Sequence, residues 1–441
     1  MLKGLRVAFH TLGCKVNIYE SEVMEEQLRE AGAEVVPFDA PADVYVINTC
    51  TVTNIADRKS RQMLHRAKKQ NSSAVLVATG CYTELADVDT LRQEGVDLVL
   101  GNNEKGSIAA ALEAYLEKGL TPVRTPIGEV RGIERLSLSK PHAHNRADVK
   151  VQDGCNQFCS YCAIPLARGR IRSKRIEDTV REVTEIAKNG IREVVLTGIH
   201  LSSYGKDLSG EADLLKLIHA VNEIPGIRRI RLGSLEPRIV TAPFVEGLLA
   251  AEKLCPHFHL SLQSGCSETL RRMNRHYTPE EYLEGVRLLR EAYGNPAITT
   301  DIIAGFPGET DEAFETSYRF AKEAGFYEMH VFKFSRRRGT AADRMPDQVP
   351  EEVKTLRSNR LLALSKEMSE AYRREALGTR EEVLTEEEVT IDGRAYLTGY
   401  TRTYIRTPVP VSCGVNTVVS GTLSALFNED TMILSPDPET P

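Results

Sequence analysis

Short apolar runs alternate with amphipathic stretches along the first 119 residues. The apolar runs are 5–10, 44–48, 75–79 and 96–100. The stretches with helical periodicity are 20–31, 57–70 and 104–117. Strands that alternate with helices of this length form βαβ units on a parallel sheet. Residues 1–120 are therefore predicted to form an open α/β domain.

A second alternation follows segment 121–147, which has little apolar periodicity and several Pro and Gly residues and is predicted to be a linker. Its strand candidates are 149–152, 193–196, 229–232, 257–262, 298–303 and 330–334. Its helical candidates are 176–188, 214–223, 279–292 and 312–324. Six strand–helix steps are too few for a closed eight-fold barrel, which needs about 250 residues. Residues 148–377 are predicted to form a partial (β/α)6 barrel that ends in a charged helix.

The pattern changes again near residue 378, where short β-rich pieces are separated by turns that contain Gly, Pro and Asn. This pattern predicts a small all-β barrel over residues 378–441. The expected fold class is α/β, with an N-terminal open parallel sheet, a central partial barrel and a small C-terminal β-barrel.

Composition narrows the protein class. The chain has 441 residues, 41% hydrophobic and 27% charged, as in soluble globular proteins. The first ten residues contain no export signal, and no apolar run approaches the roughly 20 residues that span a bilayer. Nine cysteines, an odd number, do not fit a small secreted disulfide scaffold. We expect a cytoplasmic protein with no membrane partner.

The tightest chemical motif is Cys155, Cys159 and Cys162, with spacing C-x3-C-x2-C directly after a predicted strand. A short loop can place three thiolates on three corners of a [4Fe–4S] cluster and leave the fourth iron open. Zinc is the main alternative, although structural zinc sites favour four ligands and no fourth Cys or His stands in the usual register. Three unrelated buried cysteines are the third interpretation.

With Tyr161 before its last cysteine, this motif resembles the signature of radical S-adenosylmethionine enzymes. The resemblance implies that the open iron chelates S-adenosylmethionine and that one electron from the cluster cleaves it to a 5′-deoxyadenosyl radical. It also implies a partial barrel whose first strand precedes the cluster loop.

A second set of cysteines is dispersed. Cys14, Cys50 and Cys81 each stand just beyond the carboxyl end of a predicted parallel strand, the edge at which open α/β sheets bind ligands. Their small neighbours allow close approach of the backbone; these are Gly13, Thr49 and Gly80. The pattern alone fits either a second cluster or three ordinary buried cysteines.

The surrounding motifs, LGCKVN, NTCTVT and ATGCY, together resemble the N-terminal domain of the methylthiotransferases. The resemblance covers nearly the whole chain, including a C-terminal barrel like the TRAM RNA-binding module. It implies that Cys14, Cys50 and Cys81 hold an auxiliary [4Fe–4S] cluster that supplies or carries sulfur. The remaining cysteines are expected to be structural; they are Cys255, Cys266 and Cys413.

LGCKVN is most similar to the branch that acts on threonylcarbamoyladenosine. This implies methylthio transfer to C2 of that adenine, next to the tRNA anticodon. The implied partners are a tRNA anticodon stem-loop and an electron donor such as flavodoxin or ferredoxin, with the enzyme expected to be a monomer. The alternatives are the isopentenyladenosine branch, the ribosomal-protein aspartate branch and a non-catalytic metal-containing RNA-binding protein.

The resemblance also implies that S-adenosylmethionine is held by loops after the barrel strands. The predicted contacts are Tyr161, Gly198, Ser261, Gln263, Asp301 and Gly305. Gly198 stands where the superfamily has a Gly-Gly-Glu motif, here replaced by Thr-Gly-Ile, so only backbone contacts are expected there.

The net charge of −6 by itself argues against an RNA partner, but the charge is unevenly distributed along the chain. Residues 378–441 hold four arginines and ten acids and so carry all of it. Local basic stretches near the predicted active site fit contact with a phosphate backbone. The RNA-binding candidates are Arg168, Arg170, Arg172, Lys174, Arg175, Arg337, Arg338, Arg402 and Arg406. Arg337 and Arg338 are also expected to suit the carboxylate of a threonylcarbamoyl group.

Overall fold

The N-terminal part is a five-stranded parallel sheet of order β2-β1-β3-β4-β5. In this computed structural model, residues 2–142, 145–210, 212–391 and 393–437 are described. The strands are β1 (Arg6–Thr11), β2 (Glu34–Val36), β3 (Val44–Thr49), β4 (Val75–Gly80) and β5 (Leu98–Val99). The predicted parallel sheet is confirmed, with β2 as an additional short edge strand.

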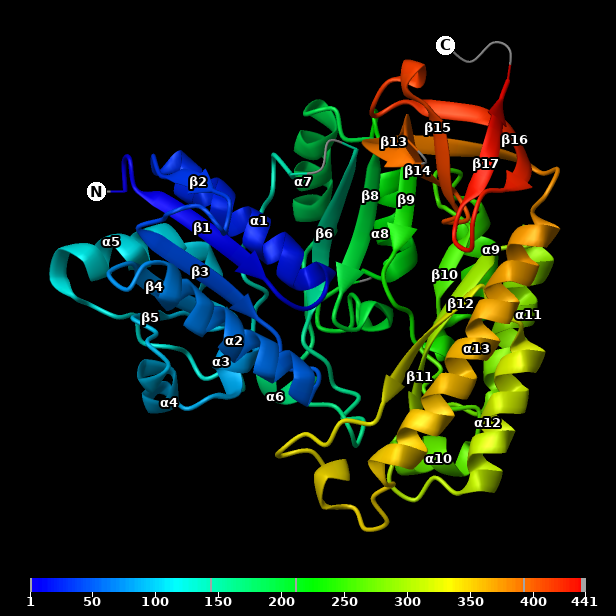
Figure 1. Cartoon of the computed structure of the whole chain (residues 1–441), viewed down its shortest axis with the longest axis horizontal. Coiled ribbons are helices and arrows are strands. Elements are labelled where there is room, and N and C mark those ends of the chain that lie inside the picture. The colour runs from blue at the N-terminus through cyan, green and yellow to red at the C-terminus, as the bar shows by residue number, and fades with distance from the viewer. Residues whose placement is uncertain (1, 143–144, 211, 392, 438–441) are drawn as a thin grey trace.

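Helices cover both faces of this sheet (Figure 1). They are α1 (Lys15–Glu30), α2 (Asn54–Gln70), α3 (Cys81–Leu85), α4 (Val88–Gln93) and α5 (Ile108–Lys118). Leu28 of α1 and Leu112 of α5 share one buried cluster, whereas Leu64 of α2 belongs to the cluster on the other face. The sheet is therefore buried on both sides, as its apolar strands require.

The central part is a half-barrel built from two sheets, β7-β6-β8-β9 and β10-β11-β12. Its strands are β6 (Arg146–Asp153), β7 (Arg172–Ser173), β8 (Glu193–Gly198), β9 (Arg229–Leu232), β10 (His257–His259), β11 (Ala297–Ala304) and β12 (Glu328–Lys333). Single parallel bridges, Ile230↔Leu254 and Leu235↔Leu260, join the two sheets. All six predicted strands are present, and β7 is an unpredicted antiparallel addition to β6.

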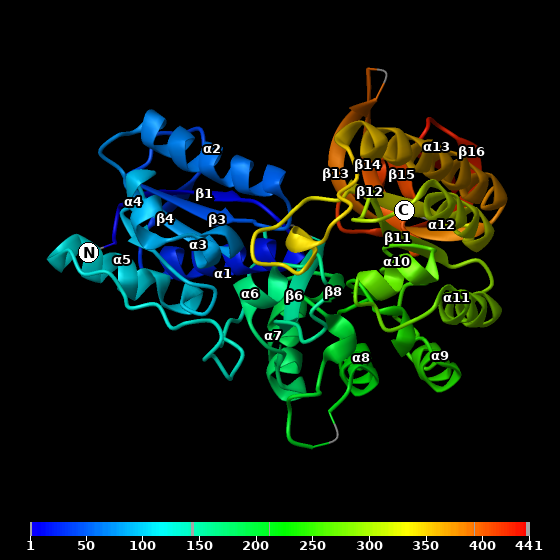
Figure 2. The same ribbon diagram turned by 90° about the horizontal axis from the view of Figure 1, so that it is seen from below.

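Figure 2 shows these strands as an arc with helices on its outer side. The outer helices are α7 (Ile176–Lys188), α8 (Leu214–Asn222), α9 (Ala242–Leu249), α11 (Pro279–Tyr293) and α12 (Asp311–Ala324). Two short helices, α6 (Ile164–Arg168) and α10 (Ser267–Arg272), lie in the loops after β6 and β10. Packing of the outer helices on the strands makes the largest hydrophobic core, which leaves the concave side of the arc for polar residues.

A long helix, α13 (Glu351–Glu375), leads to a five-stranded antiparallel sheet of order β15-β14-β13-β16-β17. Its strands are β13 (Arg380–Ile391), β14 (Arg394–Thr401), β15 (Arg406–Pro410), β16 (Val418–Leu426) and β17 (Met432–Pro436). The predicted all-β C-terminal domain is thereby confirmed, and it encloses a small apolar core of its own.

The C-terminal sheet docks at the amino end of the half-barrel, away from the predicted cluster loop (Figure 1). Arg229 donates to the carbonyl oxygens of Tyr400 and Glu382, at 2.7 and 2.6 Å. Arg231 donates to those of Thr401 and Arg402. In the described part of the chain, no helix is both long and apolar enough to cross a membrane.

Candidate cluster and cofactor site

The first cysteine triad lies in the loop between β6 and α6. Gly154 begins this loop at φ +68°, and a Cβ there would lie 1.9 Å from the carbonyl oxygen of Arg170, so no side chain fits. The amide of Cys155 donates to the carbonyl of Gly169 at 3.0 Å, which closes the loop at its base. Burial, and the neighbouring Cys159 thiol, raise the pKa of Cys162 to about 12. The structure thus brings the three thiols into one loop.

The second triad gathers at the carboxyl edge of the N-terminal sheet. Cys14 follows β1, Cys50 follows β3, and Cys81 begins α3 directly after β4. A Cβ on Gly13 would lie 3.2 Å from Cβ of Cys50, so the two loops touch. Burial is the main cause that raises the pKa of Cys50 to about 11, and the charges of Cys81 and Cys14 add to it. The three cysteines therefore lie at the carboxyl ends of neighbouring strands.

Arg168 of α6 bonds to one cysteine of the second triad and to the end of the strand that precedes the first. Its Nε donates to Sγ of Cys81 at 3.2 Å, and its Nη2 donates to Oδ1 of Asn17 at 2.7 Å. Its other bonds go to Glu20 of α1 and to Asp153 at the end of β6. This side chain, with no solvent exposure, places its charge between the N-terminal domain and the first cluster loop.

A buried network of charges surrounds Arg168. Lys150 lies 2.7 Å from Glu20 and 2.6 Å from Asp153, and Lys105 also pairs with Glu20. Burial alone would raise the pKa of Glu20, but the charges of Arg168, Lys105 and Lys150 hold it well below its ordinary value. These acids are therefore ionised, and each buried cation has an anionic partner.

The prediction that five basic residues after the cluster loop contact RNA is wrong for three of them. Arg168, Arg172 and Lys174 are buried. Arg172 lies 3.4 Å from Asp153, and Lys174 pairs with Glu182. Buried cations with carboxylate partners are not available to a phosphate backbone. The exposed members of the stretch are Arg170 and Arg175.

Arg337, also predicted to contact RNA or a substrate carboxylate, fastens two domains instead. It lies after β12. Its Nη1 donates to Oδ1 of Asn54 at 2.6 Å and lies 2.8 Å from Oδ2 of Asp57, and its Nη2 donates to Oγ1 of Thr51 at 2.5 Å. Because these partners adjoin Cys50 and the start of α2, Arg337 binds the N-terminal domain. Its neighbour Arg338 is exposed.

Of the two C-terminal candidates, Arg402 is used for docking. Its Nη2 donates to the carbonyl oxygens of Glu252 and Leu254, both at 2.7 Å, which corrects its assignment to RNA. Arg406 is exposed and remains a candidate.

The predicted S-adenosylmethionine contacts cluster at the carboxyl ends of the barrel strands. Gln263, at φ +67°, donates its amide to the carbonyl of Asp301 at 2.7 Å. Gly305, at φ +74°, donates to Oε1 of Glu309 at 2.9 Å. Tyr161 packs edge-on against Phe306, with ring centroids 6.5 Å apart. The other two predicted contacts lie at or beyond the ends of β8 and β10; these are Gly198 and Ser261.

Arg275 is a site residue that the sequence did not indicate. Its Nη1 lies 3.5 Å from Sγ of Cys159, and its Nη2 donates to the carbonyl of Ser261 at 3.2 Å. It thus connects the first cysteine triad to the strand end where cofactor contacts are predicted. It lies outside any motif, after α10, so its sequence position gave no signal.

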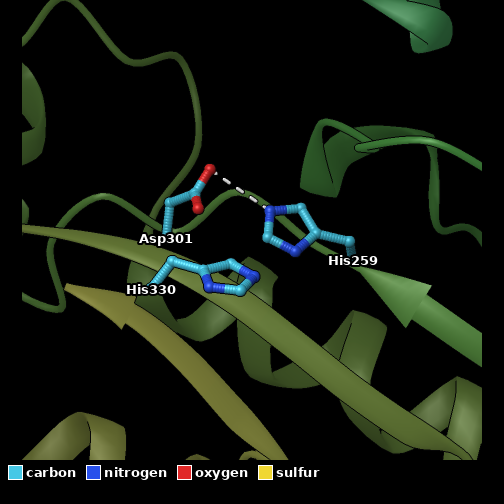
Figure 3. Close-up of side chains that lie close together, drawn as sticks. All are labelled: His259, Asp301 and His330. Atoms are coloured by element: carbon cyan, nitrogen blue, oxygen red, sulfur yellow. Dashed lines mark ion pairs between the residues drawn. The ribbon is translucent and has the colours of Figure 1, made fainter. Parts of the chain in front are cut away.

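A second unpredicted group lies on the concave side of the half-barrel (Figure 3). Nε2 of His259 lies 3.2 Å from Oδ2 of Asp301, and His330 stacks on His259 with ring centroids 5.5 Å apart. The three side chains come from adjacent strands, β10, β11 and β12. One ligand atom of each lies within 4.8 Å of the others.

Two known protein families match the two parts of the chain that carry the cysteine triads. The Radical SAM superfamily matches residues 149–321, and the Uncharacterized protein family UPF0004 matches residues 6–101. The chain is 40% identical to the threonylcarbamoyladenosine tRNA methylthiotransferase MtaB of Bacillus subtilis (strain 168), over 91% of this chain and 89% of that protein. The chain belongs to the radical S-adenosylmethionine methylthiotransferase family. It is an enzyme of the transferase class.

Other methylthiotransferases are nearly as similar. Identity is 39% to the MtaB protein of Aquifex aeolicus (strain VF5), over 84% of this chain and 89% of that protein. A tRNA-2-methylthio-N(6)-dimethylallyladenosine synthase of Clostridium botulinum (strain Alaska E43 / Type E3) is 35% identical, over 89% and 87%. The radical S-adenosylmethionine methyltransferase TsrM from Kitasatospora setae shares the fold at 16% identity and a TM-score of 0.55, over 77% of this chain and 74% of that one.

Proposed function

We propose that this enzyme transfers a methylthio group to C2 of N6-threonylcarbamoyladenosine next to the anticodon of tRNA. The observation that supports the proposal is the side chain of Arg168, which donates to Sγ of Cys81 in the N-terminal domain and to Asp153, two residues before Cys155. Identity to the two MtaB proteins, at 39–40%, exceeds that to the dimethylallyladenosine enzyme, at 35%.

We assign Cys155, Cys159 and Cys162 to the cluster that binds S-adenosylmethionine, and Cys14, Cys50 and Cys81 to an auxiliary [4Fe–4S] cluster. When bound, these groups supply a carbon-centred radical and a sulfur atom. Arg275 would orient the first centre through Cys159 and Ser261. Arg168 would fix the second centre relative to the first.

The two hydrogen-bonded strand-end loops at Gln263 and Gly305 would hold S-adenosylmethionine at the carboxyl end of the half-barrel. The exposed cations Arg170, Arg175 and Arg338 would approach the phosphate backbone of the anticodon stem-loop. The tRNA would be met in the cytoplasm, where flavodoxin or ferredoxin would donate electrons to a monomeric enzyme.

Mass spectrometry of tRNA nucleosides from cells with and without the gene tests the substrate. We expect 2-methylthio-N6-threonylcarbamoyladenosine to disappear in the deletion strain and to return with the wild-type gene. Loss of 2-methylthio-N6-dimethylallyladenosine instead would assign the enzyme to the other tRNA branch. A complementing gene with Cys81→Ala serves as the inactive control.

Iron analysis tests the two-cluster assignment on the same protein. Anaerobic reconstitution should give about eight irons per chain for two [4Fe–4S] clusters. Cys81→Ala should retain about four irons and still cleave S-adenosylmethionine under strong reductant, without sulfur insertion. About four irons in the wild-type enzyme would contradict the auxiliary cluster.

A further inference from the structure

The group formed by His259, Asp301 and His330 faces the interior of the half-barrel. Asp301 and His330 are paired in register, and His259 pairs with Thr299 on the same face of β11. The alternate residues Phe258, Ile298 and Ile302 belong to the core under the outer helices. Because side chains alternate along a strand, the three polar groups point to the concave side.

This trio includes Asp301, which the sequence assigned to S-adenosylmethionine but which lies in the middle of β11, four residues before the strand-end loop. His259 precedes Gln263 by four residues, and Asp301 precedes Gly305 by four, which corresponds to roughly 13 Å along the strands. Lys15, next to Cys14, acts electrostatically on Asp148 of β6 and His257 of β10. Lys15, which follows Cys14 directly in sequence, therefore lies near the strands that carry the trio.

Two members of the trio, His330 and Asp301, can form further hydrogen bonds with a ligand. His259 is held on both sides, because its Nδ1 lies 2.9 Å from Oγ1 of Thr299 and its Nε2 contacts Asp301. His330 is exposed, and its ring nitrogens have no hydrogen-bond partner among the residues that the structure describes. Asp301 keeps a quarter of its side chain exposed. A ligand would meet an imidazole and a carboxylate side by side.

A divalent cation is the alternative occupant of the trio, because one ligand atom of each side chain lies within 4.8 Å of the others. Metal analysis of the wild-type enzyme and of His330→Leu separates a bound cation from an organic ligand.

We propose that His330 and Asp301, oriented by His259, bind the polar N6 substituent of the substrate base and thereby select threonylcarbamoyladenosine. The inference rests on the proposed function and names the residues that would discriminate its substrate. A threonylcarbamoyl group offers a carboxylate, a hydroxyl and urea N–H groups. His330 donates to the carboxylate or carbonyl, and Asp301 accepts from the hydroxyl or N–H.

A dimethylallyl group has no polar atoms and would form no hydrogen bond with either side chain. A bound substituent displaces water from His330 and Asp301, and only a polar substituent replaces the hydrogen bonds that are lost with that water. The trio thus replaces Arg337, which the N-terminal domain occupies, as the receptor for this substituent.

Binding of anticodon stem-loop RNAs to the cluster-loaded enzyme tests the proposal without turnover. The RNAs carry N6-threonylcarbamoyladenosine, N6-dimethylallyladenosine or unmodified adenosine at the same position. We expect His330→Leu to weaken binding of the first RNA about tenfold or more, the loss expected for a hydrogen bond to a charged group. Binding of the other two should not change. His330→Gln, which retains a donor, should recover part of the affinity.

His65→Leu is the matched control, because His65 is an exposed histidine on α2; it should not alter the preference among the three RNAs. Equal losses for all three RNAs, or no loss, in His330→Leu and Asp301→Asn would overturn the proposal. So would a stoichiometric divalent metal that is lost in His330→Leu. If the wild-type enzyme prefers the RNA with N6-threonylcarbamoyladenosine, His330→Leu loses this preference and no methylthio nucleoside is produced, the proposed function fails and this inference stands.

Discussion

Nε of Arg168 donates a 3.2 Å hydrogen bond to Sγ of Cys81, and the two residues belong to different domains. The remaining guanidinium donors bind Glu20, Asn17 and Asp153. A planar fork with five donors suits this arrangement, and a lysine ammonium does not.

Replacing Arg168 should destabilise the junction of the two domains. In Arg168→Gln, Glu20 and Asp153 keep Lys150 but lose the hydrogen bonds from Arg168, and we expect the free energy of unfolding to fall by about 1–3 kcal/mol. Arg168→Lys should recover only part of it. Urea unfolding measures the change. Arg170→Gln is the control, because Arg170 is exposed and lies over the ring of Phe158 at 4.5 Å; it should cost less than about 1 kcal/mol. Equal effects of both variants would contradict this role.

Glu193 should make the docking of the C-terminal sheet sensitive to acid. Burial would raise its pKa, but Arg231, Arg146 and Arg229 outweigh burial and lower it from 4.5 to about 2. A lowered pKa stabilises the folded state above the ordinary value of the group, and this contribution is lost as the pH falls from 4.5 toward 2. The shift corresponds to roughly 3 kcal/mol.

We therefore expect the wild-type protein to lose stability steadily below pH 4.5, whereas Glu193→Gln starts less stable at pH 7 and changes less on acidification. Urea unfolding at several pH values measures both slopes. Glu284→Gln is the control, since Glu284 is exposed on α11. A Glu193→Gln curve parallel to that of the wild type would show that Glu193 is not the source.

Arg337→Ala should loosen the start of α2. Removal of the guanidinium leaves Asn54, Thr51 and Asp57 without a bond that now spans two domains. We expect faster amide hydrogen exchange at the start of α2 and around Cys50, measured by mass spectrometry. Arg338→Ala changes an exposed neighbour in the same loop and should leave this exchange unaltered. If the two variants behave alike, the contact does not hold the domains.

Gly154→Ala should abolish assembly of the first cysteine loop. The backbone has φ +68°, and the new Cβ would lie 1.9 Å from the carbonyl of Arg170. Gly190→Ala is a matched control, since Gly190 also has positive φ (+90°), but a Cβ added there would meet no atom within 4 Å. We expect normal iron incorporation in Gly190→Ala and loss of about half the iron in Gly154→Ala. Equal iron contents would contradict the steric argument.

The cysteine placements could be predicted because they follow a local rule. Parallel strands end at one edge, so a cysteine after each of β1, β3 and β4 must come together there. The start of α1 was predicted less well: the helix begins at Lys15, directly after Cys14, whereas the predicted helical stretch begins at residue 20.

The basic residues were harder to assign because their partners are distant in sequence. A run of arginines and lysines after the cluster loop has the composition of an exposed RNA-binding surface. Glu20, which holds Arg168, lies 148 residues away, and only the packing of α1 against β6 brings the two together. For the same reason, the spacing of His259, Asp301 and His330 carried no signal.

Arg168 and Arg337 bind the N-terminal domain to the half-barrel at two points. Arg168 lies after β6, the first strand of the half-barrel, and Arg337 lies after β12, the last strand. A domain held at two points does not swing toward its substrate. Under the proposed assignment, we expect the distance between the two cysteine triads to stay constant through the reaction cycle. Turnover would then require exchange of S-adenosylmethionine and movement of the RNA, without rearrangement of the two domains.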